Sequence, residues 1–164
     1  MRPEMRKWLG LALLVIVLDQ ITKLLITSNF QLGYSQAMAP FFDLVFVFNR
    51  GAAFSFLSNA GGWQRWFFVA LAFGISGWLT VMLRHHASEK LMPFAISLVL
   101  GGALGNVIDR FAYGAVVDFL SFHVGGFYWP AFNVADSGIT VGVVLMLWHQ
   151  FVTGGEHDRA HQTL

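Results

Sequence analysis

Four long apolar segments constrain what this chain of 164 residues can fold into. They cover residues 8–26, 63–83, 91–108 and 134–151, and each is close to the roughly 20 residues that a helix needs to cross a bilayer. Charged residues make up only 12% of the chain, against about 25% in soluble domains, and the mean hydropathy is +0.61. We therefore predict an all-α membrane protein: one domain, residues 1–164, with four transmembrane helices.

The basic residues outside these segments are unevenly distributed. Three lie on the side of the segments 27–62 and 109–133, either within them (Arg50 and Arg110) or just after the first (Arg65), and six lie at the termini and in the loop after the second apolar segment (Arg2, Arg6, Lys7, Arg84, Lys90 and Arg159). Because cytoplasmic loops carry an excess of Lys and Arg, this pattern predicts that both termini are cytoplasmic. Asp19 and Lys23 interrupt the first segment, which favours a retained helix over a cleaved signal peptide.

The two outer segments contain patterns that are typical of strands. Residues 42–48 are rich in β-branched and aromatic side chains, and residues 116–122 have a similar composition between turns that contain Gly and Pro. We expect these stretches to belong to a small external sheet over the helices, built from the segments 40–58 and 113–130.

Two aspartates lie at the edges of the apolar segments on this outer side. Asp118 follows the third segment and Asp136 begins the fourth. A charged group at the edge of hydrocarbon costs a few kcal/mol, so it suggests a functional site. Two carboxyl groups that meet there could share one proton, which is the chemistry of an aspartyl protease. The spacing does not show that they meet, and Asn133 could simply be the cap of a helix that begins near Asp136.

The remaining polar residues of the apolar segments also need partners. Asp19 and Lys23 are one helical turn apart and are expected to form an ion pair near the outer interface, where Lys23 reaches toward water, or else to hold the acidic site or contact a lipid headgroup. Asn106 and Arg110 share a helix face, which we expect to line the acidic cleft. Asp109 points elsewhere and is expected to pair with an arginine or to cap the following loop.

Two other functions would use some of the same residues. A proton- or ion-coupled carrier could relay charge through Asp19, Asp118 and Asp136, but carrier sites usually lie near the bilayer midplane on broken helices. A metal site could use Asp118, His123 and Asp136, but the tight ligand spacing of known metal motifs is missing. The chain contains no cysteine, which excludes disulfides, thiolate ligands and thiol nucleophiles.

The sequence resembles the lipoprotein signal peptidases (type II signal peptidases), which are aspartyl proteases of the bacterial inner membrane. The resemblance rests on five blocks in the same order: DQITK at 19–23, NRGAAFSF at 49–56, GGALGNVIDR at 101–110, VVDF at 116–119 and FNVAD at 132–136. Together these blocks cover nearly the whole chain from the first apolar segment to the fourth.

The resemblance implies that Asp118 and Asp136 form the catalytic dyad. It also implies a β-cradle on the periplasmic membrane surface, and cleavage of prolipoproteins on the amino side of a cysteine that already carries diacylglycerol. We expect a further set of residues to hold the peptide or support the carboxylates: Asn49, Gly51, Asn106, Arg110, Asn133, Asp19 and Lys23. Globomycin, a cyclic peptide antibiotic, is the inhibitor implied by the family. Contact with phospholipid and a monomeric state are expected, without metal, cofactor or nucleic acid.

Overall fold

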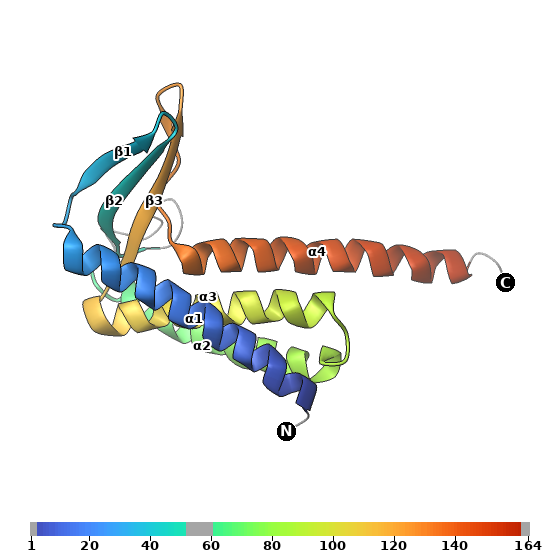
Figure 1. Cartoon of the computed structure of the whole chain (residues 1–164). Coiled ribbons are helices and arrows are strands. Elements are labelled where there is room, and N and C mark those ends of the chain that lie inside the picture. Colours follow the sequence, from blue (N-terminus) through green and yellow to red (C-terminus); the bar gives the residue numbers. More distant parts are fainter. Residues whose placement is uncertain (1–2, 52–60, 162–164) are drawn as a thin grey trace.

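The computed structural model describes residues 3–51 and 61–161, with side chains up to residue 152 (Figure 1). Its helices are α1 (Pro3–Asn29), α2 (Gln64–His86), α3 (Leu91–Tyr113) and α4 (Val134–His161). Each of the four is long and apolar enough to cross a membrane, which confirms the predicted class of fold. The helices extend beyond the predicted segments because the sequence argument counted apolar residues, whereas the helical backbone continues through polar ones such as Asp109 and Arg110.

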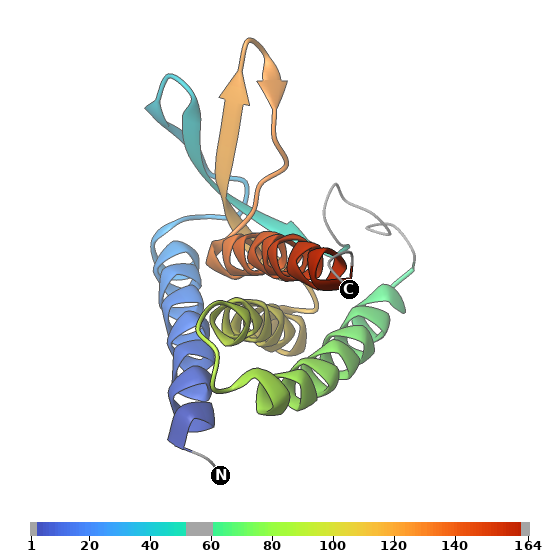
Figure 2. The same ribbon diagram turned by 90° about the vertical axis from the view of Figure 1, so that its right-hand side faces the viewer.

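Helix α3 is the interior helix of the bundle. It lies between α1, α2 and α4 when the molecule is viewed along the helices (Figure 2), and 67% of its apolar window is buried, against 11–28% for the other three. Its glycines allow this close packing: a Cβ added at Gly101 would lie 2.6 Å from the carbonyl oxygen of Ala12 on α1, and one added at Gly102 would collide with the carbonyl oxygen of Ala135 on α4. The backbones of α1 and α4 therefore approach α3 directly.

The strands form one antiparallel sheet in the order β1-β2-β3-β4, where β1 is Ser35–Ala39, β2 is Phe42–Asn49, β3 is Val116–Val124 and β4 is Phe127–Tyr128. The two predicted strands are present as β2 and β3. The sequence argument missed β1, which contains no β-branched or aromatic residue. Residues 52–58 of the predicted cradle lie outside the described residues.

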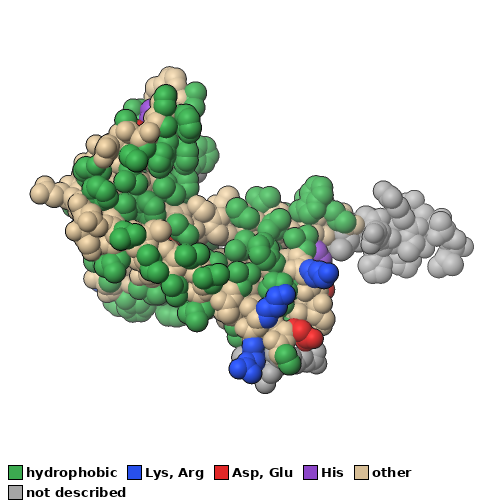
Figure 3. All heavy atoms as spheres, in the orientation of Figure 1, with side chains coloured by type: hydrophobic (Ala, Val, Ile, Leu, Met, Phe, Trp, Pro, Cys, Tyr) green, Lys and Arg blue, Asp and Glu red, His purple; other side chains and the backbone are tan. Residues whose placement is uncertain are grey.

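The sheet adjoins the bundle where α1 ends and α4 begins, and projects sideways from the helices (Figure 1). A buried apolar cluster joins the two parts, with Ile26 of α1 packed against Phe46, Val117 and Phe119 of the sheet. Hydrophobic side chains cover much of the visible helical surface, and the visible Lys and Arg side chains gather at the end away from the sheet (Figure 3). This distribution suits a bundle surrounded by lipid with the sheet at one membrane surface.

Candidate active site

The segment between β3 and α4 brings the two aspartates to the same place. Asp118 is the third residue of β3, and Asp136 is the third residue of α4. The chain leaves β4 and folds back onto β3, where the amide of Phe132 donates to the carbonyl oxygen of Leu120 at 3.0 Å and the amide of Phe119 donates to that of Phe132, also at 3.0 Å. This return places Asn133, the next residue, beside Asp118.

Asn133 connects the two aspartates through its side-chain amide. Its Oδ1 accepts a hydrogen bond from the backbone N–H of Asp136 at 2.8 Å, so it caps α4, as the sequence allowed. Its Nδ2 donates to Oδ1 of Asp118 at 2.7 Å. The same side chain therefore begins the helix of one aspartate and holds the carboxyl group of the other.

Asn106 on α3 donates a hydrogen bond to the carboxyl group of Asp136, as Asn133 does to that of Asp118. Its Nδ2 donates to Oδ1 of Asp136 at 2.7 Å, while its Oδ1 accepts from Nζ of Lys23 at 2.9 Å and from Nδ2 of Asn133 at 3.3 Å. Each aspartate thus receives a neutral amide donor, which steadies a carboxylate without forming a direct ion pair with it.

The electrostatic environment of Asp118 favours a shared proton. Only 1% of its surface is exposed. Burial, followed by the negative charge of Asp136, raises the pKa of Asp118 to about 7, although hydrogen bonds from Asn49 and Asn133 act in the opposite direction. When two carboxyl groups interact strongly, their protons are lost in two steps that belong to the pair.

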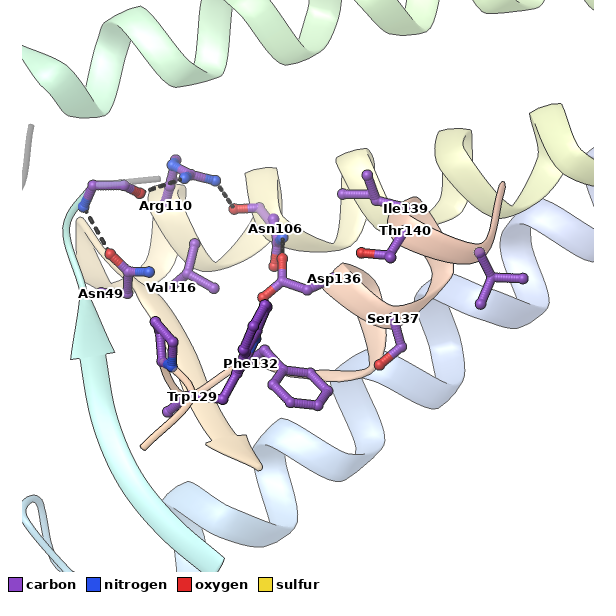
Figure 4. A pocket seen from close by; sticks show the side chains of 14 residues that line it. Asn49, Asn106, Arg110, Val116, Trp129, Phe132, Asp136, Ser137, Ile139 and Thr140 are labelled. Carbon is purple, nitrogen blue, oxygen red and sulfur yellow. Dashed lines mark hydrogen bonds between the residues drawn. The ribbon is translucent and has the colours of Figure 1, made fainter. Parts of the chain in front are cut away.

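A cavity of about 550 Å³ lies next to the pair. Its wall is built by the end of β2, by α3, by the segment before α4 and by the first turns of α4 (Figure 4). Asp136 faces this cavity, while Asp118 is buried beside Asn133. The remaining lining residues include both polar and apolar side chains: Asn49, Gly51, Asn106, Arg110, Val116, Trp129, Pro130, Ala131, Phe132, Ser137, Ile139, Thr140 and Val141.

Arg110 and Asn49 hold the end of β2 against this cavity. The guanidinium of Arg110 donates to the carbonyl oxygen of Gly51 at 3.1 Å and to that of Asn106 at 3.2 Å, and it lies over the ring of Phe68. The amide of Gly51 donates to Oδ1 of Asn49 at 2.9 Å. The structure therefore places Asn106 and Arg110 on the same wall of the cavity, as their spacing predicts.

Asp19 and Lys23 form the expected ion pair, with Nζ of Lys23 2.8 Å from Oδ2 of Asp19. The expected location of Lys23 is wrong: only 3% of its side chain is exposed, so it lies inside the bundle and does not reach toward the interface. The expected arginine partner of Asp109 is also wrong, because Asp109 pairs with Lys23 at 2.8 Å. Asp109 does hold the following loop, since its Oδ2 accepts from the amide of Val117 at 3.0 Å.

The sequence argument missed Gln20 as a member of this network. Its Nε2 donates to Oδ1 of Asp109 at 2.9 Å and to the carbonyl oxygen of Gly105 at 3.2 Å. An amide inside an apolar segment, directly after Asp19, was a signal that could have identified it, because such a group must find hydrogen-bond partners within the bundle.

The metal interpretation is not consistent with the position of His123. Its Nε2 lies 3.2 Å from Oδ1 of Asp43, and its ring stacks on Tyr128, so the structure does not bring it together with Asp118 and Asp136. Within residues 3–51 and 61–152, no three His, Cys, Asp or Glu side chains are arranged to hold a metal ion.

The comparisons with known proteins agree with the geometry. A family model described as signal peptidase (SPase) II matches residues 11–152. The lipoprotein signal peptidase of Azoarcus sp. (strain BH72) is 56% identical over 95% of this chain and 89% of that protein, and that of Burkholderia mallei (strain SAVP1) is 52% identical over 87% and 86%. A bacterial membrane enzyme whose structure was solved by the in meso method at 2.3 Å resolution superposes with a TM-score of 0.77 and 32% identity, covering 92% of this chain and 90% of its own.

These matches leave the carrier interpretation unsupported, as does the position of Asp118 on a strand. The family model covers more than half of the chain, and both relatives are far above the level at which family membership is ambiguous. The chain therefore belongs to the signal peptidase II family of membrane proteases.

Proposed function

We propose that this protein removes the signal peptide from lipid-modified prolipoproteins, cutting on the amino side of the diacylglyceryl cysteine, with Asp118 and Asp136 as its catalytic dyad. One observation supports the proposal: the carboxyl groups of Asp118 and Asp136 are linked through the hydrogen-bonded amides of Asn133 and Asn106, and Asp136 lines a cavity. The names of the relatives support the class of substrate.

The dyad would act by general acid–base catalysis. Asp118, whose pKa is raised to about 7 and which therefore holds its proton below neutral pH, is the proton donor in this assignment, and Asp136, which faces the cavity, is the base. Asp136 takes a proton from water as the oxygen attacks the scissile carbonyl carbon. Asp118 hydrogen-bonds the developing oxyanion, and a proton passes to the leaving nitrogen when the C–N bond breaks. The dyad then holds one proton again.

The cavity suits a substrate that is partly peptide and partly lipid. It is lined by Asp136 and by the side chains of Asn49 and Arg110, which can hold the peptide backbone. On α4 it is lined by Ile139 and Val141 among others, on a helix of which only 11% of the apolar window is buried within the protein. Acyl chains placed there would contribute roughly 0.8 kcal/mol for each buried CH₂ group.

The same proposal includes the membrane and the orientation of the chain. We place the protein in the bacterial inner membrane with the sheet and the dyad facing the periplasm and both termini in the cytoplasm. The end of the bundle away from the sheet carries the visible basic side chains, which supports this orientation (Figure 3). One chain supplies both aspartates, so a monomer is sufficient, and globomycin is expected to compete with substrate for the cavity.

A cleavage assay with two precursors tests the proposal. The purified protein, Asp118→Asn and Asp136→Asn would each be incubated with a prolipoprotein that carries diacylglycerol and with the same precursor without it. Asp43→Asn is the matched control, because it makes the same chemical change on the neighbouring strand, where Asp43 contacts His123. We expect the wild type and the control to cleave the lipidated precursor, and both dyad variants to leave it intact.

Two results would contradict this function. Full cleavage by either dyad variant would remove the assignment of the catalytic residues. Equal cleavage of both precursors by the wild type would remove the requirement for lipid, and with it the proposed class of substrate.

A further inference from the structure

We propose that Lys23 is a positioning residue for the catalytic dyad: one buried ammonium fixes the backbone next to both aspartates and the orientation of the amide that holds Asp136. The inference rests on the proposed function, because it concerns how that dyad is held. It extends to Gln20 and Asp109, neither of which contacts a carboxyl group of the dyad in the described hydrogen bonds and ion pairs.

The first part of the argument concerns the residues that precede the aspartates. Oδ1 of Asp19 accepts a hydrogen bond from the amide of Ala135 at 2.9 Å, and Ala135 directly precedes Asp136. Oδ2 of Asp109 accepts from the amide of Val117 at 3.0 Å, and Val117 directly precedes Asp118.

The same ammonium lies between these two carboxylates. Nζ of Lys23 is 2.8 Å from Oδ2 of Asp19 and 2.8 Å from Oδ2 of Asp109. Because charge-assisted contacts of this length have well-defined geometry, the start of α4 and the beginning of β3 are both fixed relative to Lys23. The distance between the two catalytic carboxyl groups is therefore set partly by a residue that contacts neither of them.

The second part concerns the amide of Asn106. A lysine ammonium has three donors and no acceptor, and the third donor of Lys23 goes to Oδ1 of Asn106 at 2.9 Å. The oxygen of this amide must therefore face Lys23, which leaves Nδ2 to donate to Asp136 at 2.7 Å. With Lys23 removed, Oδ1 of Asn106 would keep only the longer hydrogen bond from Nδ2 of Asn133 at 3.3 Å, and the amide could turn over and present its oxygen to the carboxylate.

The composition of the network separates this role from that of an ordinary structural ion pair. One buried cation contacts two buried carboxyl groups, and each of these accepts from the backbone amide directly before an aspartate of the dyad, whereas an ordinary ion pair joins one cation to one carboxylate. Gln20 supplies an additional donor to Asp109 at 2.9 Å. Gly105 leaves the space for Asp19, since a Cβ at this position would lie 2.7 Å from Oδ2 of that side chain.

Loss of the Asn106 orientation has a defined effect on pH dependence. An amide oxygen turned toward Asp136 disfavours the charged state of the dyad, so the dyad loses its proton only at a higher pH. The whole profile of cleavage against pH should move to higher pH. The other charged groups that face this region are Asp19 on α1, and Asp109 and Arg110 on α3. The variant described below leaves Asp109 and Arg110 unchanged and removes the charge of Asp19 together with that of Lys23.

The test is the double variant Lys23→Met with Asp19→Asn, which keeps the summed charge of the network at its wild-type value of minus one. The asparagine introduced in place of Asp19 can still accept from the amide of Ala135, so the main loss is the donor to Asn106. We expect kcat for a lipidated precursor to fall about a hundredfold, the effect of a displacement of about 1 Å in a catalytic group. KM should be unchanged, and the pH profile should move upward.

Leu83→Ala is the matched control for lost stability. Leu83 is fully buried in the apolar cluster around Met5 and Trp8, away from the dyad. If its melting temperature is lowered as much as that of the double variant, Leu83→Ala should still keep wild-type kcat and the wild-type pH profile. If the double variant does not fold, Gln20→Leu takes its place and should lower kcat about tenfold, the effect of one hydrogen bond to a charged group.

Wild-type kcat and an unmoved pH profile in a folded Lys23 or Gln20 variant would overturn the inference, and so would an equal loss of kcat in Leu83→Ala. These outcomes are distinct from a failure of the proposed function, which would appear as absence of cleavage by the wild type or as full cleavage by Asp118→Asn.

Discussion

The substitution Asp118→Asn should make the protein more stable and inactive at the same time. Burial and the charge of Asp136 raise the pKa of Asp118 from 3.8 to about 7 in the folded protein. Between these values the folded state binds more protons than the unfolded chain, so the free energy of unfolding decreases as the pH rises and levels off above pH 7. A shift of this size corresponds to roughly 4 kcal/mol at about 1.36 kcal/mol per unit.

An asparagine at this position removes the cost of the buried charge. Its Oδ1 can still accept the hydrogen bond from Nδ2 of Asn133, which Asp118 accepts at 2.7 Å. We therefore expect the variant and the wild type to have equal stability near about pH 4. At about pH 8 the variant should be more stable by up to about 4 kcal/mol, and each kcal/mol corresponds to roughly 2–4 °C in melting temperature for a chain of this size.

Unfolding in detergent micelles at both pH values, followed by the fluorescence of the six tryptophans, measures this difference. Asp43→Asn provides the comparison, because its carboxylate is paired with His123 and its loss should bring no gain on the alkaline side. A variant Asp118→Asn that is no more stable than the wild type at the higher pH would refute the reasoning, since the charge of Asp118 would then be well accommodated by the folded protein.

Two further predictions follow from the same geometry. Cleavage by the wild type should decline on the alkaline side near pH 7, where the dyad loses its shared proton, and a rate that stays constant to about pH 9 would contradict this. Gly102→Ala should cost about 1–3 kcal/mol and lower the cleavage rate at least about tenfold, because its Cβ would collide with the carbonyl oxygen of Ala135 and displace the start of α4. Gly77→Ala is the control: its Cβ would meet nothing within 4 Å, so it should stabilise the protein by roughly 0.5–1 kcal/mol. Equal effects of the two substitutions on melting temperature and cleavage rate would disprove the argument that Gly102 is required for the close approach of α4 to α3.

The elements that the sequence predicts well are those with a local signal. Four spans follow from the length and hydropathy of their segments, and β2 and β3 follow from runs of aromatic and β-branched residues. β1 could not be recognised in this way, because its five residues form a strand through pairing with β2, such as Ser35 with Val45. A strand of that kind is determined by its neighbour and has little propensity of its own.

In the candidate site, too, the features that depend on sequence spacing could be predicted, and those that depend on tertiary contacts could not. The spacing of Asn106 and Arg110 was sufficient to place them on the same wall of the cavity. No spacing could show that Lys23 is enclosed within the bundle, because a lysine near the end of an apolar segment usually extends toward water. Its burial follows from two carboxylates on different helices, Asp19 and Asp109, that together offset the cost of desolvation.

The position of Asn106 between Lys23 and Asp136 explains how a cation can support a dyad that must remain able to exchange a proton. An ammonium in direct contact with Asp136 would favour the carboxylate so strongly that the proton would no longer be shared. Through the amide, with contacts of 2.9 Å and 2.7 Å, Lys23 fixes the direction of a neutral donor while its own charge is balanced by Asp19 and Asp109. The amide thus transmits orientation to Asp136 without placing the ammonium in direct contact with its carboxyl group.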